Sequence, residues 1–415
     1  MAYAVDPDIT VAHTLDAAFY RDEEAFADAR ERIFARTWQW IGDLADVAAP
    51  RSLSPRALLP GLLDEPLLLS RDAAGTLRCL SNVCTHRGNV LVREARSGAS
   101  DIRCGYHSRR FDLAGRMTFM PEFGEVKHFP SPADDLPAAA FAAWANHGFA
   151  AIDAAAPLDA FIGDIAARVA ALPLPQFRSD PASSRDYVVR AHWALYVENY
   201  LEGFHIPFVH PALSRAVDYA SYTDELFRYS SLQIALAKEG DTAFDVASIT
   251  GAGRGRVAAI YAWIFPNLML NFYPWGLSLN HVVPEAMDRT RVEFRSYVRD
   301  ESKRDRGAEG ALHEVELEDE AVVEAVQRGV RSRVRELSAG ERLFRQGDTR
   351  PRRADRDIRS ARSSAGRPCT PPRSTVSTAG ARTRHGVRWG APDVDVEQPR
   401  RRFSTSARWA WPASS

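Results

Sequence analysis

The feature that most constrains this chain is a pair of short motifs, each with one cysteine and one histidine. Cys84 and His86 form a C-x-H motif, and Cys104 and His107 form a C-x-x-H motif 17 residues further on. Short β-like runs broken by glycine and proline surround both motifs, so each motif is expected on a loop of a small β domain. The two loops together predict a metal site with four protein ligands.

The distribution of the ligands indicates which metal group they hold. Zinc modules usually place like ligands together, as C-x-x-C followed by a pair of histidines. Here each motif supplies one cysteine and one histidine, which suits a [2Fe-2S] cluster with two thiolates on one iron and two imidazoles on the other, a Rieske centre. Zinc binding is the less favoured alternative. Cys79 lies outside the pattern and is expected to be a buried core residue.

A second group of metal-binding side chains lies in the segment 198–211. His205 and His210 fall about 140° apart on a regular helix, so a straight helix would not direct both at one ion. Pro207 lies between them and predicts a break that turns the second imidazole toward the first. An isolated pair of this kind is more often structural, but a nearby electron-donating cluster favours a metal site.

Two histidines and one remote carboxylate form the facial triad of non-haem Fe(II) oxygenases. We expect the carboxylate to be Asp319, in a predicted helix over 316–337, although Glu318 remains an alternative. Glu202 precedes His205 by three residues, so the two are expected to share a helical face.

Length and composition predict several units in one chain. A chain of 415 residues with 45% apolar and 26% charged residues has ordinary globular usage for two or three domains. It has no membrane-length apolar run and no secretory leader, so a cytoplasmic location is expected. We predict an α+β fold with four parts: a helical segment over 1–37, an all-β Rieske domain over 38–155, a catalytic domain over 156–340 with an antiparallel sheet and a long C-terminal helix, and a basic, disordered or misframed tail over 341–415.

Within these parts, one helix is expected over 15–37 and a strand over 187–197. The segment 251–255, Gly-Ala-Gly-Arg-Gly, is weakly similar to a dinucleotide fingerprint but precedes a strand and is interpreted as a hairpin loop. No NAD or flavin site is visible, so electrons are expected from a separate ferredoxin or NAD(P)H-dependent flavin reductase. Binding to nucleic acid or membrane is not favoured.

Residues 15–338 resemble the large (alpha) subunits of the Rieske non-haem iron oxygenases, which serve ring-hydroxylating and demethylating systems. The resemblance implies a helix-grip catalytic domain and a homotrimer. It assigns the cluster to Cys84, His86, Cys104 and His107, and the iron to His205, His210 and Asp319. It also places Glu202 where a carboxylate links one subunit's cluster histidine to the next subunit's iron.

Three departures qualify the resemblance. Glu202 replaces the commoner Asp, as in members that oxidise quaternary ammonium compounds, and the segment ENYLEGFHIPFVHP is similar to the choline monooxygenase branch. Ser108, Arg109 and Arg110 follow His107 where Gly-Trp is frequent. The tail lacks the His- and Phe-containing ending of the family.

The resemblance implies an oxidoreductase that uses O2 to hydroxylate or demethylate a small organic substrate, and a quaternary or methylated amine such as choline or a betaine is preferred. The alternatives are an aromatic-ring-hydroxylating dioxygenase and an electron-transfer protein with an inactive iron site. Aromatic side chains near the second metal site could form a cage for a cation, although residues at strand positions are more often core: Trp193, Phe204, Trp263, Tyr273 and Trp275.

Overall fold

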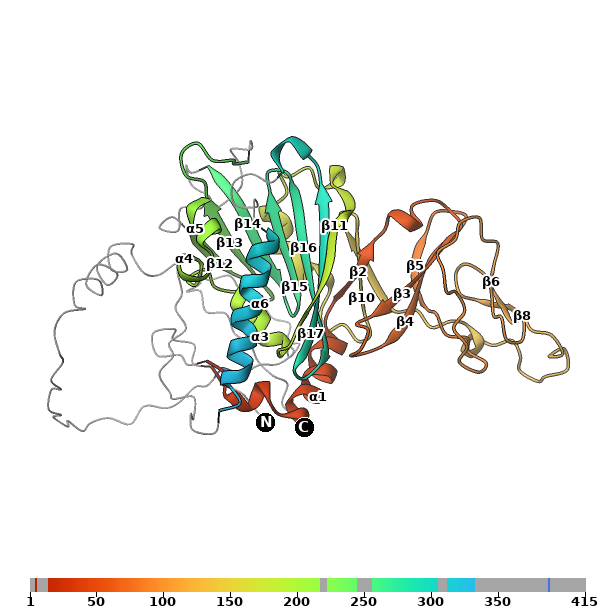
Figure 1. Ribbon diagram of the computed structural model, residues 1–415. Helices are drawn as coiled ribbons and strands as arrows, with labels where there is room; N and C mark the ends of the chain where they lie inside the picture. Colours follow the sequence, from red (N-terminus) through yellow and green to blue (C-terminus); the bar gives the residue numbers. More distant parts are fainter. Residues whose placement is uncertain are drawn as a thin grey trace, which may run out of the picture.

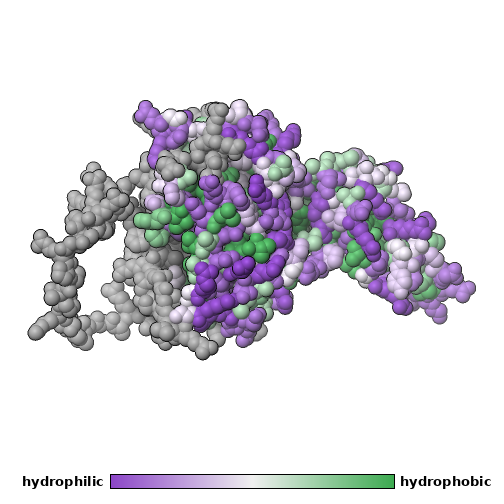
Figure 2. Space-filling model, viewed as in Figure 1, coloured by the Kyte–Doolittle hydropathy of each residue, from purple (hydrophilic) through white to green (hydrophobic). Residues whose placement is uncertain are grey.

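The computed structural model describes residues 4–5, 14–216, 222–244, 256–304, 312–332 and 387–388. An elongated β domain projects from a larger α+β domain (Figure 1). Polar and charged side chains cover much of the visible face, with small apolar patches between them (Figure 2). Among the described residues, no helix is long and apolar enough to cross a membrane. The cytoplasmic location stays a prediction.

The β domain consists of three antiparallel sheets of three strands each. Their strands, in spatial order, are β2 (Gln39–Asp43), β10 (His147–Ala151) and β9 (Ala140–Trp144); β3 (Ser52–Leu58), β4 (Glu65–Arg71) and β5 (Leu77–Ser81); and β6 (Ile102–Arg103), β7 (Arg110–Phe111) and β8 (Met117–Phe119). The loop from β5 to β6 carries Cys84 and His86, and the loop from β6 to β7 carries Cys104 and His107. Both cysteines are part of a buried cluster with Leu68 of β4, so the loops are anchored in the domain core.

The larger domain is built on a seven-stranded antiparallel sheet. Its strands, in spatial order, are β11 (Arg178–Val189), β17 (Arg289–Val298), β16 (Gly276–Ala286), β15 (Leu268–Tyr273), β14 (Val257–Ile264), β13 (Ser230–Leu236) and β12 (Thr223–Leu226). Side chains alternate between the two faces of a strand. Thus Leu270 packs in the cluster that contains α2 (Leu158–Arg168), and Met269 packs in the cluster that contains α3 (Trp193–Tyr200) and α6 (Leu312–Gly329).

The N-terminal segment packs on the larger domain. Phe19 and Phe34 lie in the same buried cluster as α3 and α6, and the hydroxyl of Tyr20 lies 2.7 Å and 2.9 Å from the two carboxylate oxygens of Glu198. In the described part of the chain, the remaining helices are α1 (Glu23–Arg32), α4 (Ile206–Val209), α5 (Pro211–Ala216) and six short 3-10 helices, Ala17–Tyr20, Phe34–Arg36, Ala45–Val47, Pro132–Asp134, Leu174–Gln176 and Glu301–Lys303.

Three predicted elements differ from the structure. The single helix over 15–37 is three helical pieces, because the Asp22 side chain caps a new start for α1. The strand predicted over 187–197 ends at Val189, and α3 follows from Trp193. The helix predicted over 316–337 begins earlier, at Leu312, and is described to Gly329.

Two predictions fall outside the described residues. The interpretation of 251–255 as a hairpin loop is one, and the interpretation of the tail over 341–415 is the other. Within that tail, only β18 (Val387–Arg388) is described, as a strand paired with β1 (Ala4–Val5).

Candidate functional site

The four predicted cluster ligands lie on two loops of the β domain that contact each other. Cys84 and Cys104 are buried, and the imidazole rings of His86 and His107 lie 4.8 Å apart between centroids. The Nδ1 atom of His107 is buried and has no hydrogen-bond partner among the described residues. Two buried thiols and two adjacent imidazoles, one with an unused nitrogen, fit the ligand set of a Rieske cluster.

The surroundings of Cys104 suit a thiolate ligand, whereas burial raises the pKa of the Cys84 thiol above its ordinary value. The backbone N–H of Tyr106 and the side-chain amide of Asn89 donate to Cys104 Sγ, at 3.4 Å and 3.6 Å. Burial alone would raise the pKa of the Cys104 thiol, but the N–H groups of Tyr106 and His107 lower it below its ordinary value. Cys79 differs, because burial raises its pKa to about 12. It is a core thiol, as the sequence indicates.

Arg109, one of the departures from the family pattern, is a buried cation beside this site. It is 2% exposed, and its Nη2 donates to Asp134 Oδ1 at 2.7 Å and to the Asp134 carbonyl at 3.1 Å. Thr85 donates to the same carbonyl at 2.7 Å. Both ligand loops are therefore fastened to the segment around Asp134.

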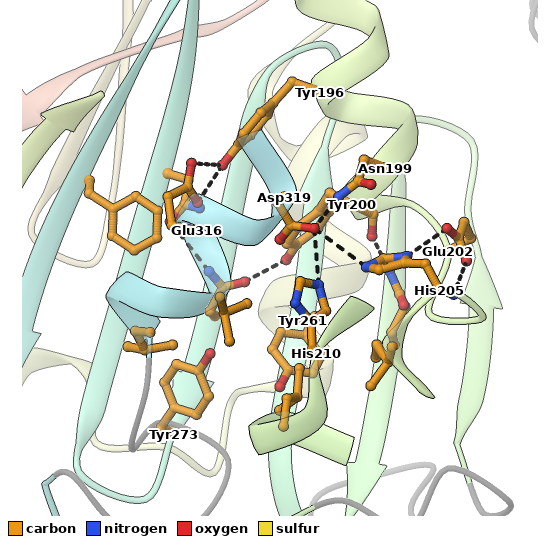
Figure 3. A pocket seen from close by; sticks show the side chains of 18 of the residues that line it. Tyr196, Asn199, Tyr200, Glu202, His205, His210, Tyr261, Tyr273, Glu316 and Asp319 are labelled. Atoms are coloured by element: carbon orange, nitrogen blue, oxygen red, sulfur yellow. Dashed lines mark hydrogen bonds and ion pairs between the residues drawn. The ribbon is translucent and has the colours of Figure 1, made fainter. Parts of the chain in front are cut away.

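The second predicted site lies where α3, α4, α5 and α6 meet (Figure 3). Ligand atoms of His205, His210 and Asp319 all lie within 4.8 Å of one another. His210 Nε2 is 3.0 Å from Asp319 Oδ1, and His205 Nε2 is 3.6 Å from the same oxygen. Two donors from the two ends of α4 and one from α6 converge on one point, which fits a mononuclear iron.

Glu318 lies on the other side of the His210 ring. Its Oε2 is 2.8 Å from His210 Nδ1, the nitrogen that faces away from Asp319. Of the two carboxylates that the sequence left open, the structure therefore brings Asp319 to the group and leaves Glu318 as the hydrogen-bond partner of a histidine.

The local geometry at the histidines differs from the predicted one. Pro207 lies in the first turn of α4, where proline is tolerated because those N–H groups have no helical partner. The break occurs at His210, the non-helical end of α4. Glu202 lies beyond the end of α3 rather than on a helical face, and its Oε1 is 2.6 Å from His205 Nδ1.

Helix α6 is held in place by hydrogen bonds at Asp319 and at two later positions. Asn199 donates to Asp319 Oδ1 at 2.6 Å. Further along α6, Glu324 accepts from the backbone N–H of Arg190 at 3.0 Å, and Gln327 accepts from that of His192 at 2.8 Å. These two contacts fix α6 to the end of β11.

A pocket of about 100 Å³ opens beside the three ligands. The side chains that line it are mostly aromatic, carboxylate and amide groups: Tyr196, Asn199, Tyr200, Glu202, His205, Ile206, His210, Leu213, Tyr222, Gln233, Tyr261, Asn271, Tyr273, Asn280, Phe294, Leu312, Val315, Glu316 and Asp319. Burial, followed by the charge of Asp319, raises the pKa of Glu316 well above its ordinary value.

Only one of the aromatic residues singled out in the sequence lines this pocket, and it is Tyr273. Trp193 and Trp263 belong to the core, Trp275 stacks behind Tyr273 at 5.7 Å, and Phe204 is half exposed. Sequence reasoning missed Glu316. The available signal was its position three residues before Asp319, which places both on one face of the helix.

Family models match both domains. Residues 37–130 match the Rieske [2Fe-2S] domain, and residues 178–359 match the catalytic domain of the ring hydroxylating alpha subunit. The chain is 26% identical to choline monooxygenase of Arabidopsis thaliana over 348 residues, 79% of each chain. It is 27% identical to the carnitine monooxygenase oxygenase subunit of Escherichia coli K12 over 331 residues, 78% of this chain and 85% of the relative.

Solved structures have the same fold. A quaternary ammonium Rieske monooxygenase superposes with a TM-score of 0.65 at 22% identity, over 79% of this chain and 88% of that one. Naphthalene 1,2-dioxygenase from Rhodococcus superposes with a TM-score of 0.63 at 19% identity, over 78% and 84%. These likenesses confirm the predicted fold class, an all-β Rieske domain joined to an α+β catalytic domain.

Two metal constellations on two matched domains define the class: the chain belongs to the Rieske non-haem iron oxygenases. Within that family it is the oxygenase (alpha) subunit, an oxidoreductase whose cofactors are a [2Fe-2S] Rieske cluster and a mononuclear non-haem iron. Members of the family use O2, a small-molecule substrate and a separate electron-transfer partner.

Proposed function

We propose that this subunit hydroxylates or demethylates a small quaternary or methylated amine, of the class of choline and the betaines. The observation that carries the proposal is the pocket beside the triad, where aromatic faces surround a small volume. Such faces attract a cation that has left water. The choline, carnitine and glycine betaine monooxygenase subunits among the relatives support the same class.

The ligands are assigned from their positions. Cys84, His86, Cys104 and His107 hold the cluster, and His205, His210 and Asp319 hold the mononuclear iron. When bound, the cluster supplies single electrons and the mononuclear iron supplies the site of O2 reduction. We assign the Rieske domain to 38–155 and the catalytic domain to 156–340, in keeping with where the two matches fall.

Carboxylates next to the triad orient its imidazoles. Glu202 accepts from His205 Nδ1 at 2.6 Å, and Glu318 accepts from His210 Nδ1 at 2.8 Å. Each contact places the ring proton on Nδ1 and leaves Nε2, the nitrogen nearer Asp319, free as a donor atom. The side-chain amide of Asn199 donates to Asp319 Oδ1 and orients that carboxylate.

Electrons pass between subunits of a homotrimer, with Glu202 as the bridge. In a single chain, the loops around β6 lie at the far end of the β domain from α3 and α6 (Figure 1). A path inside one chain would therefore be long. Inter-subunit electron transfer is described for a quaternary ammonium Rieske monooxygenase of the same fold.

Mixed subunits test this path. A His107→Ala chain lacks a cluster ligand and a His205→Ala chain lacks an iron ligand, so each is expected to be inactive alone. Co-expressed, they should regain activity, because one chain's cluster can serve another chain's iron. Mixed trimers that stay inactive with the remaining sites loaded would show that transfer is internal to the subunit. Glu202→Gln should lower turnover strongly while iron content is unchanged.

Oxygen consumption tests the substrate class. The purified subunit, a generic reductase and NADH would be incubated with choline, glycine betaine, carnitine or an aromatic acid. We expect uptake with at least one of the amines. Uptake with the aromatic acid alone would overturn the amine proposal in favour of an aromatic-ring-hydroxylating dioxygenase. If no substrate supports uptake although both metal sites are loaded, an electron-transfer protein with an inactive iron site becomes the better assignment.

A further inference from the structure

A buried carboxylate without a cationic partner lines the pocket. Glu316 is 3% exposed, and the Tyr196 hydroxyl lies 2.8 Å from each of its carboxylate oxygens. Among the described residues, no Lys, Arg or His forms an ion pair with it. Burial of an ionised carboxylate is costly unless a positive charge lies close by. The described chain supplies one neutral hydrogen bond and no positive charge, and burial raises the pKa of Glu316, so the pocket alone favours the neutral acid and a bound cation would favour the carboxylate.

The rest of the pocket suits a positive charge. The rings of Tyr222 and Tyr261 lie 6.4 Å apart between centroids, and those of Tyr261 and Tyr273 lie 6.1 Å apart. All three line the same cavity as Glu316. Tyrosine faces attract cations, and a quaternary ammonium group is well recognised by several such faces together. Among the described residues that line it, there is no Lys or Arg, and the two histidines are those placed with Asp319.

Glu316 also has the right position relative to the predicted iron. It lies three residues before Asp319 on α6, so the two side chains leave the same helical face about one turn apart. In Figure 3, Glu316 and Tyr196 lie together on one side of the group formed by Asp319, His205 and His210. A cation held at Glu316 would place the carbon atoms bonded to its nitrogen next to the triad.

We propose that the Glu316 carboxylate is the counter-ion of the substrate's positively charged nitrogen and is the residue that selects a cationic substrate over a neutral one. This inference rests on the proposed function, because it assigns recognition of the amine's positive charge to one side chain of the pocket. Tyr196 is a positioning residue, because its hydroxyl holds the carboxylate and lies one side chain away from the bound cation.

Binding of a charged ligand and its neutral isostere tests the role. Choline and 3,3-dimethylbutan-1-ol have the same shape, and only choline is charged. Isothermal titration calorimetry on the anaerobic holoenzyme would measure both affinities. In the Glu316→Gln variant, choline affinity should fall about tenfold or more, the size of a lost charged interaction. The affinity for the neutral alcohol should stay within about twofold. Glu314→Gln is the matched control, since it removes the same charge from an exposed position on α6.

The outcomes separate the two proposals. If Glu316→Gln binds choline as well as the wild type does, the counter-ion role is wrong while the amine substrate class stands. If the wild type binds no quaternary amine and consumes oxygen only with an aromatic acid, the proposed function itself is wrong. If Glu316→Gln fails to load iron, Glu316→Asp decides, because it keeps the charge on a shorter side chain. A weakened preference for choline over the alcohol in Glu316→Asp supports the role, and an unchanged preference contradicts it.

Discussion

Replacing Arg109 by methionine should destabilise the cluster domain. The methionine keeps the apolar stem and removes the guanidinium, which is 2% exposed and donates to the carboxylate and carbonyl of Asp134. It also removes the cationic contact with the rings of Phe111 and Phe129, at 5.7 Å and 5.6 Å. Among the described residues, Thr85 then provides the remaining hydrogen bond from the ligand loops to Asp134.

The expected loss in the free energy of unfolding follows from how deeply Arg109 and Asp134 are buried. Removing one partner of a buried ion pair typically costs about 3–5 kcal/mol, because the other charge is left uncompensated. The Asp134 side chain is 23% exposed, so water can solvate it in part and the low end applies, about 3 kcal/mol. For a domain of the size matched by residues 37–130, 1 kcal/mol shifts the melting temperature by about 4–8 °C. The expected shift is thus about 12–24 °C.

The assay follows the visible absorption of the cluster during a thermal ramp of the holoenzyme. Arg110→Met is the matched control, because Arg110 is exposed and lies over the half-exposed ring of Phe119. It should melt within about 2 °C of the wild type, as ordinary surface substitutions do. If Arg109→Met also melts within that range, the guanidinium does not fasten the cluster loops and the reasoning is refuted.

Three further predictions concern the metals, acid stability and the sheet. Iron and sulfide analysis should find about three irons and two acid-labile sulfides per chain, and His107→Ala should lose the Rieske electron paramagnetic resonance signal; stoichiometric zinc without sulfide would contradict the assignment. Burial lowers the pKa of His192 from 6.5 to about 3. As the pH falls below 6.5, the imidazole therefore becomes protonated in the unfolded state before it does in the folded state. The free energy of unfolding should then fall, by about 2 kcal/mol at pH 5. His192→Asn keeps a cap for α3 and should flatten the dependence of the urea midpoint on pH; an unchanged slope would exclude His192 as its source. A Cβ at Gly276 would overlap the backbone carbonyl of Tyr297, so Gly276→Ala should cost more than about 3 kcal/mol in chemical denaturation, and a near-neutral effect would contradict the tight β16–β17 pairing.

The metal ligands could be found from the sequence because their spacing carries the information. The C-x-H and C-x-x-H motifs are chemically distinctive, and each lies on a short loop whose ends are fixed by strands. Asp319 could be placed only by the resemblance, because its contact with His210 spans 109 positions. No local periodicity reports a contact of that range.

The segment from Tyr187 to Val197 shows where local reasoning failed. Its aromatic and β-branched side chains predict a strand. Yet residues 193–197 are all buried, because α3 is enclosed by the sheet, α6 and the N-terminal segment. A helix buried all round has no polar face, so the 3.6-residue pattern that identifies surface helices is missing. Tertiary packing, rather than propensity, decides this element.

The position of α6 at the end of the described catalytic domain has a consequence for biosynthesis. His205 and His210 leave the ribosome well before Asp319. The chain from His210 to Asp319 spans 109 positions, and its two ends must come together before the three donors meet. The contacts of Glu324 and Gln327 with the end of β11 form only in the same docking step. A nascent chain that stops short of α6 therefore lacks the third donor, and tight iron retention at this site marks a completed domain.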